Sequence, residues 1–211
     1  QLFGERMIIA NATGCSSIWG GTWGTIPYTV NEKGHGPAWA NSLFEDGAEY
    51  GLGMAKATAA ARLRLRNTVH RALECKDLCP ELGALLKEWD AHFLDAQVCE
   101  KVFDAVVPKL TECKDKCELC KEMYNLRNFF PKISQWIVGG DGWAYDIGYG
   151  GLDHVIASGV DLNVIVLDTE MYSNTGGQRS KATPLGAVVK FASGGNRRQK
   201  KELGMMAMSY Q

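Results

Sequence analysis

A glycine turn that carries a carboxylate is the first feature of this sequence that could do chemistry. Gly140, Asp141 and Gly142 follow an apolar run and precede a stretch with helical spacing. Backbone N–H groups at the start of a helix favour phosphate, and glycine lets a phosphate approach the backbone. A carboxylate among those donors would repel phosphate unless a cation lay between them. The turn therefore predicts a divalent metal ion that bridges Asp141 and a phosphate-bearing ligand.

More oxygen donors follow the next apolar run. Thr169 offers a hydroxyl there, and Met171 can offer its backbone carbonyl. Magnesium prefers six hard oxygen ligands in octahedral array and usually shares them with substrate phosphates. Asp141, Thr169 and Met171 together with two diphosphate oxygens and a water would complete that set. We therefore predict a site for magnesium and a diphosphate.

Two other interpretations of the turn stay open. A nicotinamide-binding loop needs the pattern G-x-G-x-x-G, but the sequence reads G-G-D-G-W-A-Y-D and lacks the third small residue. A tight turn with a capping aspartate is the purely structural alternative, because Asp and Gly are ordinary turn residues. An acid within the phosphate turn favours the metal site over both.

The elements that must position these groups follow an α/β pattern. Apolar runs at Met7–Ala10, Ile133–Val138 and Leu162–Leu167 predict strands, and Trp143–Ser158 has helical spacing. Two buried strands joined by a helix form a βαβ unit with parallel strands. The loops after the three strands are residues 13–17, 140–143 and 169–178. These loops should meet at the edge of the sheet where α/β proteins bind ligands.

The segment between the first two predicted strands begins with a loop. Residues 19–37 hold five glycines and two tryptophans, a composition typical of a long loop. From about Ala38 to Glu74 the pattern predicts one long helix, with kinks expected at Gly51 and Gly53.

Further helices are predicted on both sides of the βαβ unit. One begins at Pro80, and an amphipathic stretch covers Val98–Asn125, so residues 38–130 are expected to be mainly helical without a strand. The C-terminal residues Met208–Gln211 are expected to lie in a helix. The resulting division is an N-terminal part of the cofactor domain at 1–54, a helical insertion at 55–130, and a cofactor-binding core with a following helix at 131–211.

Composition and charge restrict the classes of partner. The 211 residues include 23 Lys and Arg against 24 Asp and Glu, so no global basic field exists to attract nucleic acid or acidic lipid. No apolar run approaches the ~20 residues of a membrane-spanning helix. Seven cysteines without a secretory leader favour reduced thiols or metal ligands in a reducing compartment. Because the chain opens at Gln1, we expect it to be one incomplete domain of a longer protein.

Several runs of the sequence resemble the thiamine-diphosphate domain of pyruvate:ferredoxin oxidoreductases. The matching runs are residues 11–17, 37–46, 140–154, 168–178 and 180–187, whereas residues 55–130 match weakly. The resemblance implies an α/β fold with a parallel sheet of the thiamine-diphosphate-binding type and a mainly helical insertion.

The resemblance also implies a cofactor for the predicted magnesium site. Asp141, Thr169 and the main-chain carbonyl of Met171 are implied to hold thiamine diphosphate through Mg²⁺, and threonine at position 169 favours the ferredoxin-linked branch. Asn174 is implied as a catalytic residue beside the reactive carbon of the cofactor, and Phe44 as an aromatic residue of the cofactor cleft. The implied cofactor-binding residues also include Gly140, Gly142 and Trp143.

Cys15 has two interpretations. A lone cysteine after a strand is usually a small buried apolar residue. The resemblance instead implies that Cys15 is one of four ligands to a [4Fe-4S] cluster, two of which would precede this chain while the fourth would follow it. The ligand set within this sequence is therefore incomplete.

The other six cysteines are Cys75, Cys79, Cys99, Cys113, Cys117 and Cys120. A second cluster or a zinc site is conceivable for them, and the steps of four and three residues from Cys113 to Cys120 predict one shared helix face. Structural thiols are favoured, because apolar helix faces also recruit cysteine.

The implied activity is oxidative decarboxylation of pyruvate to acetyl-CoA and carbon dioxide, with electrons passing through iron-sulfur clusters to ferredoxin or flavodoxin. The alternatives are an oxidoreductase for another 2-oxoacid and a non-catalytic thiamine-diphosphate-binding module. The sites for pyruvate and coenzyme A, and the glutamate that activates the cofactor, are implied to lie mostly outside this sequence, so we expect the isolated polypeptide to be inactive.

The same resemblance implies an oligomeric state and a location for the longer protein. It would be a homodimer in the cytoplasm or in an anaerobic mitochondrion-related organelle. The basic run Arg197–Lys201 could attract an acidic ferredoxin. A solvated surface is the favoured interpretation of this run, because the chain as a whole is nearly neutral.

Overall fold

Two compact units make up the structure, a computed structural model that describes residues 3–210. Unit 1 comprises the residues up to Ala55 together with those from Ser134 onward, and unit 2 comprises Lys56–Ile133. The long helix α2 (Gly47–Leu73) begins in unit 1 and ends in unit 2.

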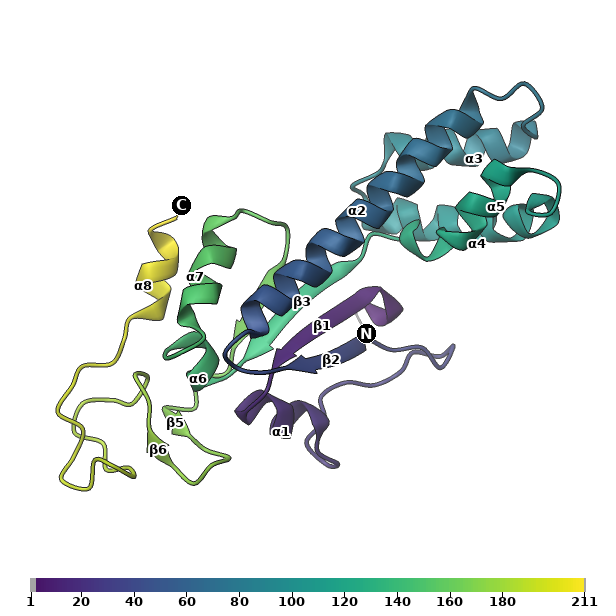
Figure 1. Cartoon of the computed structure of the whole chain (residues 1–211). Coiled ribbons are helices and arrows are strands. Elements are labelled where there is room, and N and C mark those ends of the chain that lie inside the picture. The colour runs from purple at the N-terminus through teal and green to yellow at the C-terminus, as the bar shows by residue number, and fades with distance from the viewer. Residues whose placement is uncertain (1–2, 211) are drawn as a thin grey trace. The chain divides into compact units, whose positions relative to one another are not determined.

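A four-stranded parallel sheet organises unit 1, and its strands lie side by side in Figure 1. The strands are β1 (Met7–Ala12), β2 (Ala38–Ser42), β3 (Ser134–Gly139) and β4 (Asn163–Val166), in the order β2-β1-β3-β4. All three pairings are parallel. The predicted α/β class with a parallel sheet is therefore confirmed.

The two central strands are apolar because neither of their faces meets water. Ala10 pairs with Ile137 across β1 and β3, and both are completely buried, as is Ile9. Strands buried on both faces have continuous apolar sequences rather than alternating ones, which explains why β1 and β3 could be predicted from composition. Edge strand β4 pairs with β3 through Ile137 and Val164 and is only half buried.

The prediction of a helix from Ala38 is wrong, because Ala38–Ser42 form strand β2. Its residues pair with β1 from Ile8 opposite Ala38 to Ala12 opposite Ser42. Pairing with an open strand edge outweighs the helix propensity of two alanines in so short a run. The helix begins only at Gly47, and the strand delivers Phe44 to the same sheet edge as the loops after β1, β3 and β4.

The predicted crossover helix Trp143–Ser158 is also wrong as a single element. It is divided into α6 (Asp141–Ala144) and α7 (Tyr149–Ala157). At the break, Gly148 N donates to Gly142 O at 3.2 Å, and a side chain at Gly148 would lie only 2.7 Å from the carbonyl oxygen of Trp143. The chain therefore folds back over Trp143, which a straight helix could not do.

Smaller elements complete unit 1. Helix α1 (Cys15–Gly21) replaces part of the predicted loops at 13–17 and 19–37, and the described residues from 22 to 37 carry neither helix nor strand. The loop after β4 contains a hairpin of β5 (Met171–Tyr172) and β6 (Gln178–Arg179). The C-terminal helix α8 (Leu203–Met208) ends before Ser209, and Gln211 lies outside the described residues. A short 3₁₀ turn, η1 (Gly4–Arg6), precedes β1.

Unit 2 is helical and has its own core. Helices α3 (Pro80–Ala91), α4 (Ala96–Cys113) and α5 (Glu118–Asn125) pack with the later part of α2, and a 3₁₀ turn, η2 (Arg127–Phe129), follows them (Figure 1). The predicted stretch Val98–Asn125 is thus two helices. The largest completely buried side chains of this core include Trp89, Leu86, Leu110, Met123 and Phe130.

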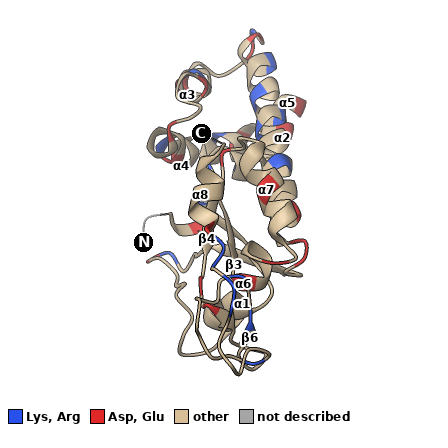
Figure 2. Ribbon diagram, turned by 90° about the vertical axis from the view of Figure 1, so that its left-hand side faces the viewer, with Lys and Arg blue, Asp and Glu red and all other residues tan. Residues whose placement is uncertain are grey.

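A buried arginine crosslinks the core of unit 2. Figure 2 shows basic residues recurring along α2, and among them Arg62 is buried. Its guanidinium group donates to the carbonyls of Phe93 at 2.7 Å and Phe129 at 3.2 Å, and to Sγ of Cys99 at 3.2 Å. Because these bonds replace water, the buried charge is tolerated, and Cys99 is part of this structural network.

Neither glycine of α2 interrupts the helix, contrary to the expected kinks. Gly51 lies against the sheet, where a Cβ would come within 2.5 Å of Cδ1 of Ile137 and 3.2 Å of Cβ of Ala10. Gly53 is exposed, and a Cβ there would meet nothing within 4 Å. Gly51 thus permits close packing of helix on sheet, whereas Gly53 makes no such contact.

Among the described helices, none has the length and apolar character needed to cross a membrane.

We expect the two glycines of α2 to respond in opposite directions to the same substitution. Gly51→Ala should lower the free energy of unfolding by about 1–3 kcal/mol because the new methyl group overpacks the contact with Ile137. Gly53→Ala should raise the free energy of unfolding by roughly 0.5–1 kcal/mol because alanine has the higher helix propensity. Urea unfolding of both variants beside the wild type measures this, and equal effects would show that α2 does not pack as described.

Candidate functional site

The carboxyl ends of the four parallel strands form one edge of unit 1, and the candidate site lies there. Because β1 lies between β2 and β3, successive connections leave β1 and β3 toward opposite sides of the sheet. A crevice opens at such a switch point, and open α/β sheets bind ligands in it. Gly14 and Cys15 follow β1 at this point, and Gly140 and Asp141 follow β3.

A cavity of about 230 Å³ occupies this edge. Its lining combines residues from all four strand-end loops: Thr13, Gly14, Cys15, Phe44, Gly140, Asp141, Gly142, Trp143, Tyr172, Asn174 and Thr175. Seven of the residues proposed from the sequence are among them. The remaining two, Thr169 and Met171, are joined by hydrogen bonds to each other and to Asp141. The structure therefore brings all nine residues together.

Asp141 is a buried carboxylate held by neutral donors. Only 1% of the residue is exposed. Ser180 Oγ donates to Oδ2 at 2.7 Å, and the Thr169 N–H donates to Oδ1 at 3.0 Å. Burial raises the pKa of Asp141, and the hydrogen bonds from Ser180 and Thr169 oppose this effect only in part. A cation at this carboxylate would stabilise its charged form.

Three oxygen atoms crowd together beside Asp141. Thr169 Oγ1 lies 2.9 Å from the carbonyl oxygen of Met171 and 3.4 Å from Oδ1 of Asp141. A hydroxyl carries one hydrogen, so it cannot satisfy both acceptors at once. Adjacent ligands of an octahedral Mg²⁺ site lie about 2.9 Å apart, since each lies 2.0–2.1 Å from the ion. Thr169 Oγ1 and the carbonyl oxygen of Met171 therefore have the chemistry and the spacing of two adjacent magnesium ligands, and Oδ1 of Asp141 lies 3.4 Å from the same hydroxyl.

The backbone between Thr169 and Met171 explains this arrangement. Glu170 has a φ of 63°, which is uncommon for a residue with a side chain. This left-handed residue reverses the chain, so that the Met171 carbonyl approaches the Thr169 hydroxyl. The carbonyl of Glu170 accepts a hydrogen bond from Thr183 Oγ1 at 2.5 Å, which holds the conformation.

Glycines of the turn after β3 are required by packing. A Cβ at Gly142 would lie 2.9 Å from the Tyr172 ring and 3.2 Å from the Phe44 ring, and one at Gly140 would lie 3.3 Å from Cβ of Cys15. The helix that follows, α6, is a single turn, so its dipole is weaker than the long predicted helix would have provided. The buried indole N–H of Trp143 has no partner among the described residues and is available as a donor.

Cys15 lies directly beside the crowded oxygens. Its Sγ donates to Oδ1 of Asn174 and accepts from Oγ1 of Thr169, each at 3.6 Å. Burial raises the pKa of the Cys15 thiol, but hydrogen bonds from Thr169 and from the backbones of Ser173 and Asn174 outweigh burial, so the pKa is below its usual value. These bonds favour the thiolate, which is the form that binds metals.

Several contacts of the site could not be predicted from the sequence. Ser180 lies in a run that carried the family resemblance, but no role followed from it. Asp168 accepts from Tyr145 Oη at 2.8 Å and forms an ion pair with Lys200 at 2.5 Å. Lys201 donates to the carbonyl of Tyr145 at 3.3 Å. The solvated interpretation of the basic run is therefore wrong for both lysines, because Lys200 pairs with Asp168 after β4 and Lys201 binds the carbonyl of Tyr145 after α6.

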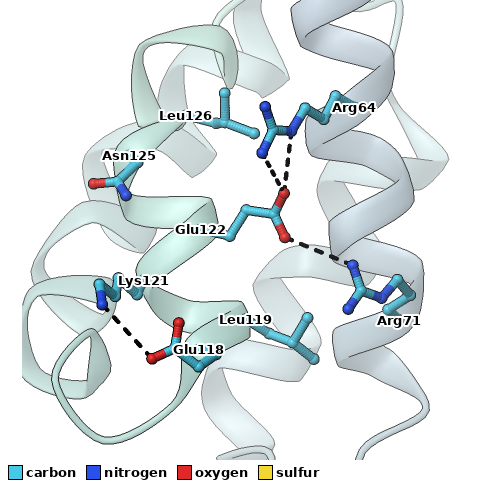
Figure 3. A pocket seen from close by; sticks show the side chains of 8 residues that line it. All are labelled: Arg64, Arg71, Glu118, Leu119, Lys121, Glu122, Asn125 and Leu126. Atoms are coloured by element: carbon cyan, nitrogen blue, oxygen red, sulfur yellow. Dashed lines mark hydrogen bonds and ion pairs between the residues drawn. The ribbon is translucent and has the colours of Figure 1, made fainter.

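A second hollow of about 560 Å³ lies on unit 2 (Figure 3). Its charged side chains neutralise one another: Glu122 pairs with Arg64 at 2.9 Å and with Arg71 at 3.6 Å, while Lys121 pairs with Glu118 at 3.6 Å. Three basic side chains here face two carboxylates, and each of these charged groups is engaged in an ion pair, so none is free for a ligand.

The remaining six cysteines all lie in unit 2. Within residues 3–210, no group of three or more His, Cys, Asp and Glu side chains is placed to hold a metal ion, and all seven cysteines are free thiols. Cys113, Cys117 and Cys120 do not share one helix face as predicted, because α4 ends at Cys113 and Cys117 caps α5.

Comparison with known proteins identifies the relatives of this chain. No protein-family model matches it. The whole chain is 54% identical over 218 residues to the pyruvate:ferredoxin oxidoreductase of Moorella thermoacetica and 53% identical over 210 residues to the pyruvate-flavodoxin oxidoreductase of Klebsiella pneumoniae. It is 56% identical over 210 residues to the mitochondrial pyruvate dehydrogenase [NADP(+)] of Euglena gracilis. The chain is a homologue of the pyruvate oxidoreductases.

The match covers only part of each relative. This chain spans 18% of the two bacterial enzymes and 12% of the Euglena enzyme. The resemblance inferred from the sequence is thus confirmed, and the named pyruvate oxidoreductases are enzymes. Residues 55–130, which carried little of the resemblance, lie within the matched length.

We expect Ser180 to determine how strongly Asp141 holds a cation. Ser180→Ala removes the donor to Oδ2, which should weaken Mg²⁺ binding in the presence of thiamine diphosphate by roughly tenfold. Calorimetric titration with Mg²⁺ measures the change. Ser158→Ala is the matched control, because that hydroxyl donates only to the Val155 carbonyl at the end of α7. Equal affinities for wild type and Ser180→Ala would contradict the proposed orientation of Asp141.

Proposed function

We propose that this chain is part of a longer pyruvate:ferredoxin or pyruvate-flavodoxin oxidoreductase, in which it holds thiamine diphosphate through Mg²⁺. The main observation is that the hydroxyl of Thr169 faces two acceptors, the carbonyl oxygen of Met171 and Oδ1 of Asp141, but has only one hydrogen to donate. A cation relieves this crowding, and a diphosphate completes the ligand shell of such a cation. Identity above 50% to named oxidoreductases supports the same proposal.

The chain's own residues would hold the metal and shape the cavity. Asp141 supplies the negative charge, while Thr169 and Met171 supply neutral oxygens at the end of the neighbouring strand. Ser180 keeps Oδ2 of Asp141 occupied, so Oδ1 is the oxygen directed toward Thr169. This fixed geometry means that little reorganisation is needed when the metal binds.

The apolar walls of the cavity would exclude water from the reacting atoms. When bound, thiamine diphosphate supplies a carbon nucleophile that adds to the keto group of a 2-oxoacid and accepts the electrons left when carbon dioxide departs. Phe44, Trp143 and Tyr172 line the cavity and form these walls. Asn174 contributes an amide at the cavity, where we propose that it hydrogen-bonds the substrate.

Cys15 would supply one ligand of a [4Fe-4S] cluster. Its thiol lies 3.6 Å from Asn174 Oδ1 and Thr169 Oγ1, so a cluster held there would be close to the cofactor. The hydrogen bonds that lower the pKa of Cys15 favour the thiolate needed for iron. The other three ligands belong to parts of the longer protein.

The complete reaction would convert pyruvate and coenzyme A to acetyl-CoA and carbon dioxide, with ferredoxin or flavodoxin as electron acceptor. The relatives named pyruvate dehydrogenase [NADP(+)] support NADP⁺ as a second candidate acceptor. Another 2-oxoacid in place of pyruvate and a non-catalytic cofactor-binding module are the remaining alternatives. We propose a homodimer for the longer protein, in the cytoplasm or in an anaerobic mitochondrion-related organelle.

We expect loss of cofactor binding when either side chain of the metal site is replaced. Asp141→Ala and Thr169→Val should each weaken binding of thiamine diphosphate in the presence of Mg²⁺ by about 100-fold or more, because even the partners of metal ligands account for 10–100-fold. Calorimetry on the full-length protein measures this affinity with and without Mg²⁺.

The control is Asp153→Asn, which changes a carboxylate that accepts hydrogen bonds from Tyr149 and Tyr210 instead. This variant should bind the cofactor like the wild type. Unchanged affinity in Asp141→Ala, or binding that does not require Mg²⁺, would refute the proposed metal site.

A further inference from the structure

Three cysteines gather where α4 passes into α5 in unit 2. Cys113 is the last residue of α4, Cys117 is the N-cap of α5, and Cys120 lies in the first turn of α5. The turn between the helices is tight, since the Cys117 N–H donates to the Cys113 carbonyl at 3.2 Å. Cys120 belongs to the apolar core of unit 2, and Cys113 packs against that core. None of these residues takes part in the proposed cofactor site.

Cys117 and Cys120 have opposite environments. Cys117 is exposed, whereas only 4% of Cys120 is exposed. The pKa of Cys117 is lowered, chiefly by hydrogen bonding from the Cys120 backbone, which outweighs burial and the nearby charge of Glu118. Burial is the main cause of the raised pKa of Cys120.

The spacing of the two residues suits a disulfide. In an α-helix the Cα atoms of residues three apart are about 5 Å apart, and disulfides need Cα atoms roughly 4.4–6.8 Å apart. The helical bond from Lys121 N to Cys117 O at 3.0 Å shows that Cys117 already belongs to the turn. Little backbone movement would therefore join the two sulfurs.

We propose that Cys117 and Cys120 form a reversible dithiol pair that is oxidised by small-molecule disulfides. Cys117 is the attacking thiol because it is exposed, and Cys120 is the resolving thiol because it is buried next to it. The pair requires no metal, in agreement with the absence of a metal-binding group among residues 3–210.

The reaction consists of two thiol–disulfide exchanges. First, the Cys117 thiolate attacks one sulfur of the oxidant R–S–S–R, forms a mixed disulfide and releases one RS⁻. Second, Cys120 loses its proton and attacks Sγ of Cys117, forming the Cys117–Cys120 bond and releasing the second RS⁻. In total the protein loses two electrons and two protons, and the oxidant becomes two thiols.

Cys79 provides a matched comparison within the same unit. It is also exposed and also caps a helix, α3, but Leu82 occupies the position three residues later. A helix start alone would therefore make both cysteines equally reactive. Cys117 differs from Cys79 by the thiol at the third following position.

Two measurements on the full-length protein test the proposal. In competitive alkylation with iodoacetamide at neutral pH, followed by peptide mass spectrometry, Cys117 should react about tenfold faster than Cys79. After treatment with oxidised glutathione, non-reducing peptide mapping should find a Cys117–Cys120 disulfide that dithiothreitol reverses.

Variants separate the two steps. Cys120→Ala, with Cys120→Ser as a second form in case one fails to fold, should stop at a stable glutathione adduct on Cys117, whereas Cys113→Ser should still form the disulfide. The proposal is overturned if Cys117 is alkylated no faster than Cys79. It is also overturned if the wild type retains a glutathione adduct on Cys117 or forms a Cys113–Cys120 disulfide instead.

Discussion

A buried negative charge at Asp141 is the constraint on which the candidate site depends. A carboxylate removed from water is costly unless donors or cations surround it, and here the donors are the neutral groups of Ser180 and Thr169. The chain supplies these donors from two further loops, so both loops must converge on the turn after β3. Within one of these loops, the left-handed conformation of Glu170 brings the Thr169 hydroxyl to 2.9 Å from the Met171 carbonyl, next to Asp141.

The parallel sheet makes this convergence possible. Loops that are distant in the sequence meet because all four strands end at one edge and because β1 lies between β2 and β3. Cys15 and Asn174 lie beside the oxygens of Asp141 and Thr169 for the same reason. A thiol, an amide and a buried carboxylate therefore line one cavity.

Unit 2 is stabilised by its own apolar core. Its helices surround an apolar core that is crosslinked by the guanidinium group of Arg62, and on its surface Arg64 of α2 pairs with Glu122 of α5. Two of its cysteines, Cys99 and Cys120, are buried in that core. Cys117 differs from them because it is exposed. The buried cysteines therefore contribute to packing, whereas Cys117 is accessible to reagents.

Local sequence was sufficient for β1, β3 and β4 and for the family, because continuous apolar runs and the turn around Asp141 are local signals. The contacts of Asp141 with Thr169 and Ser180 were decided by tertiary structure, since the acceptor and its two donors lie in different loops that meet only in the folded chain. Strand β2 and the break before α7 were missed for a related reason. An alanine-rich run becomes a strand only when β1 offers an open edge, and the helix is interrupted between Ala144 and Tyr149 because the chain folds over Trp143 at Gly148.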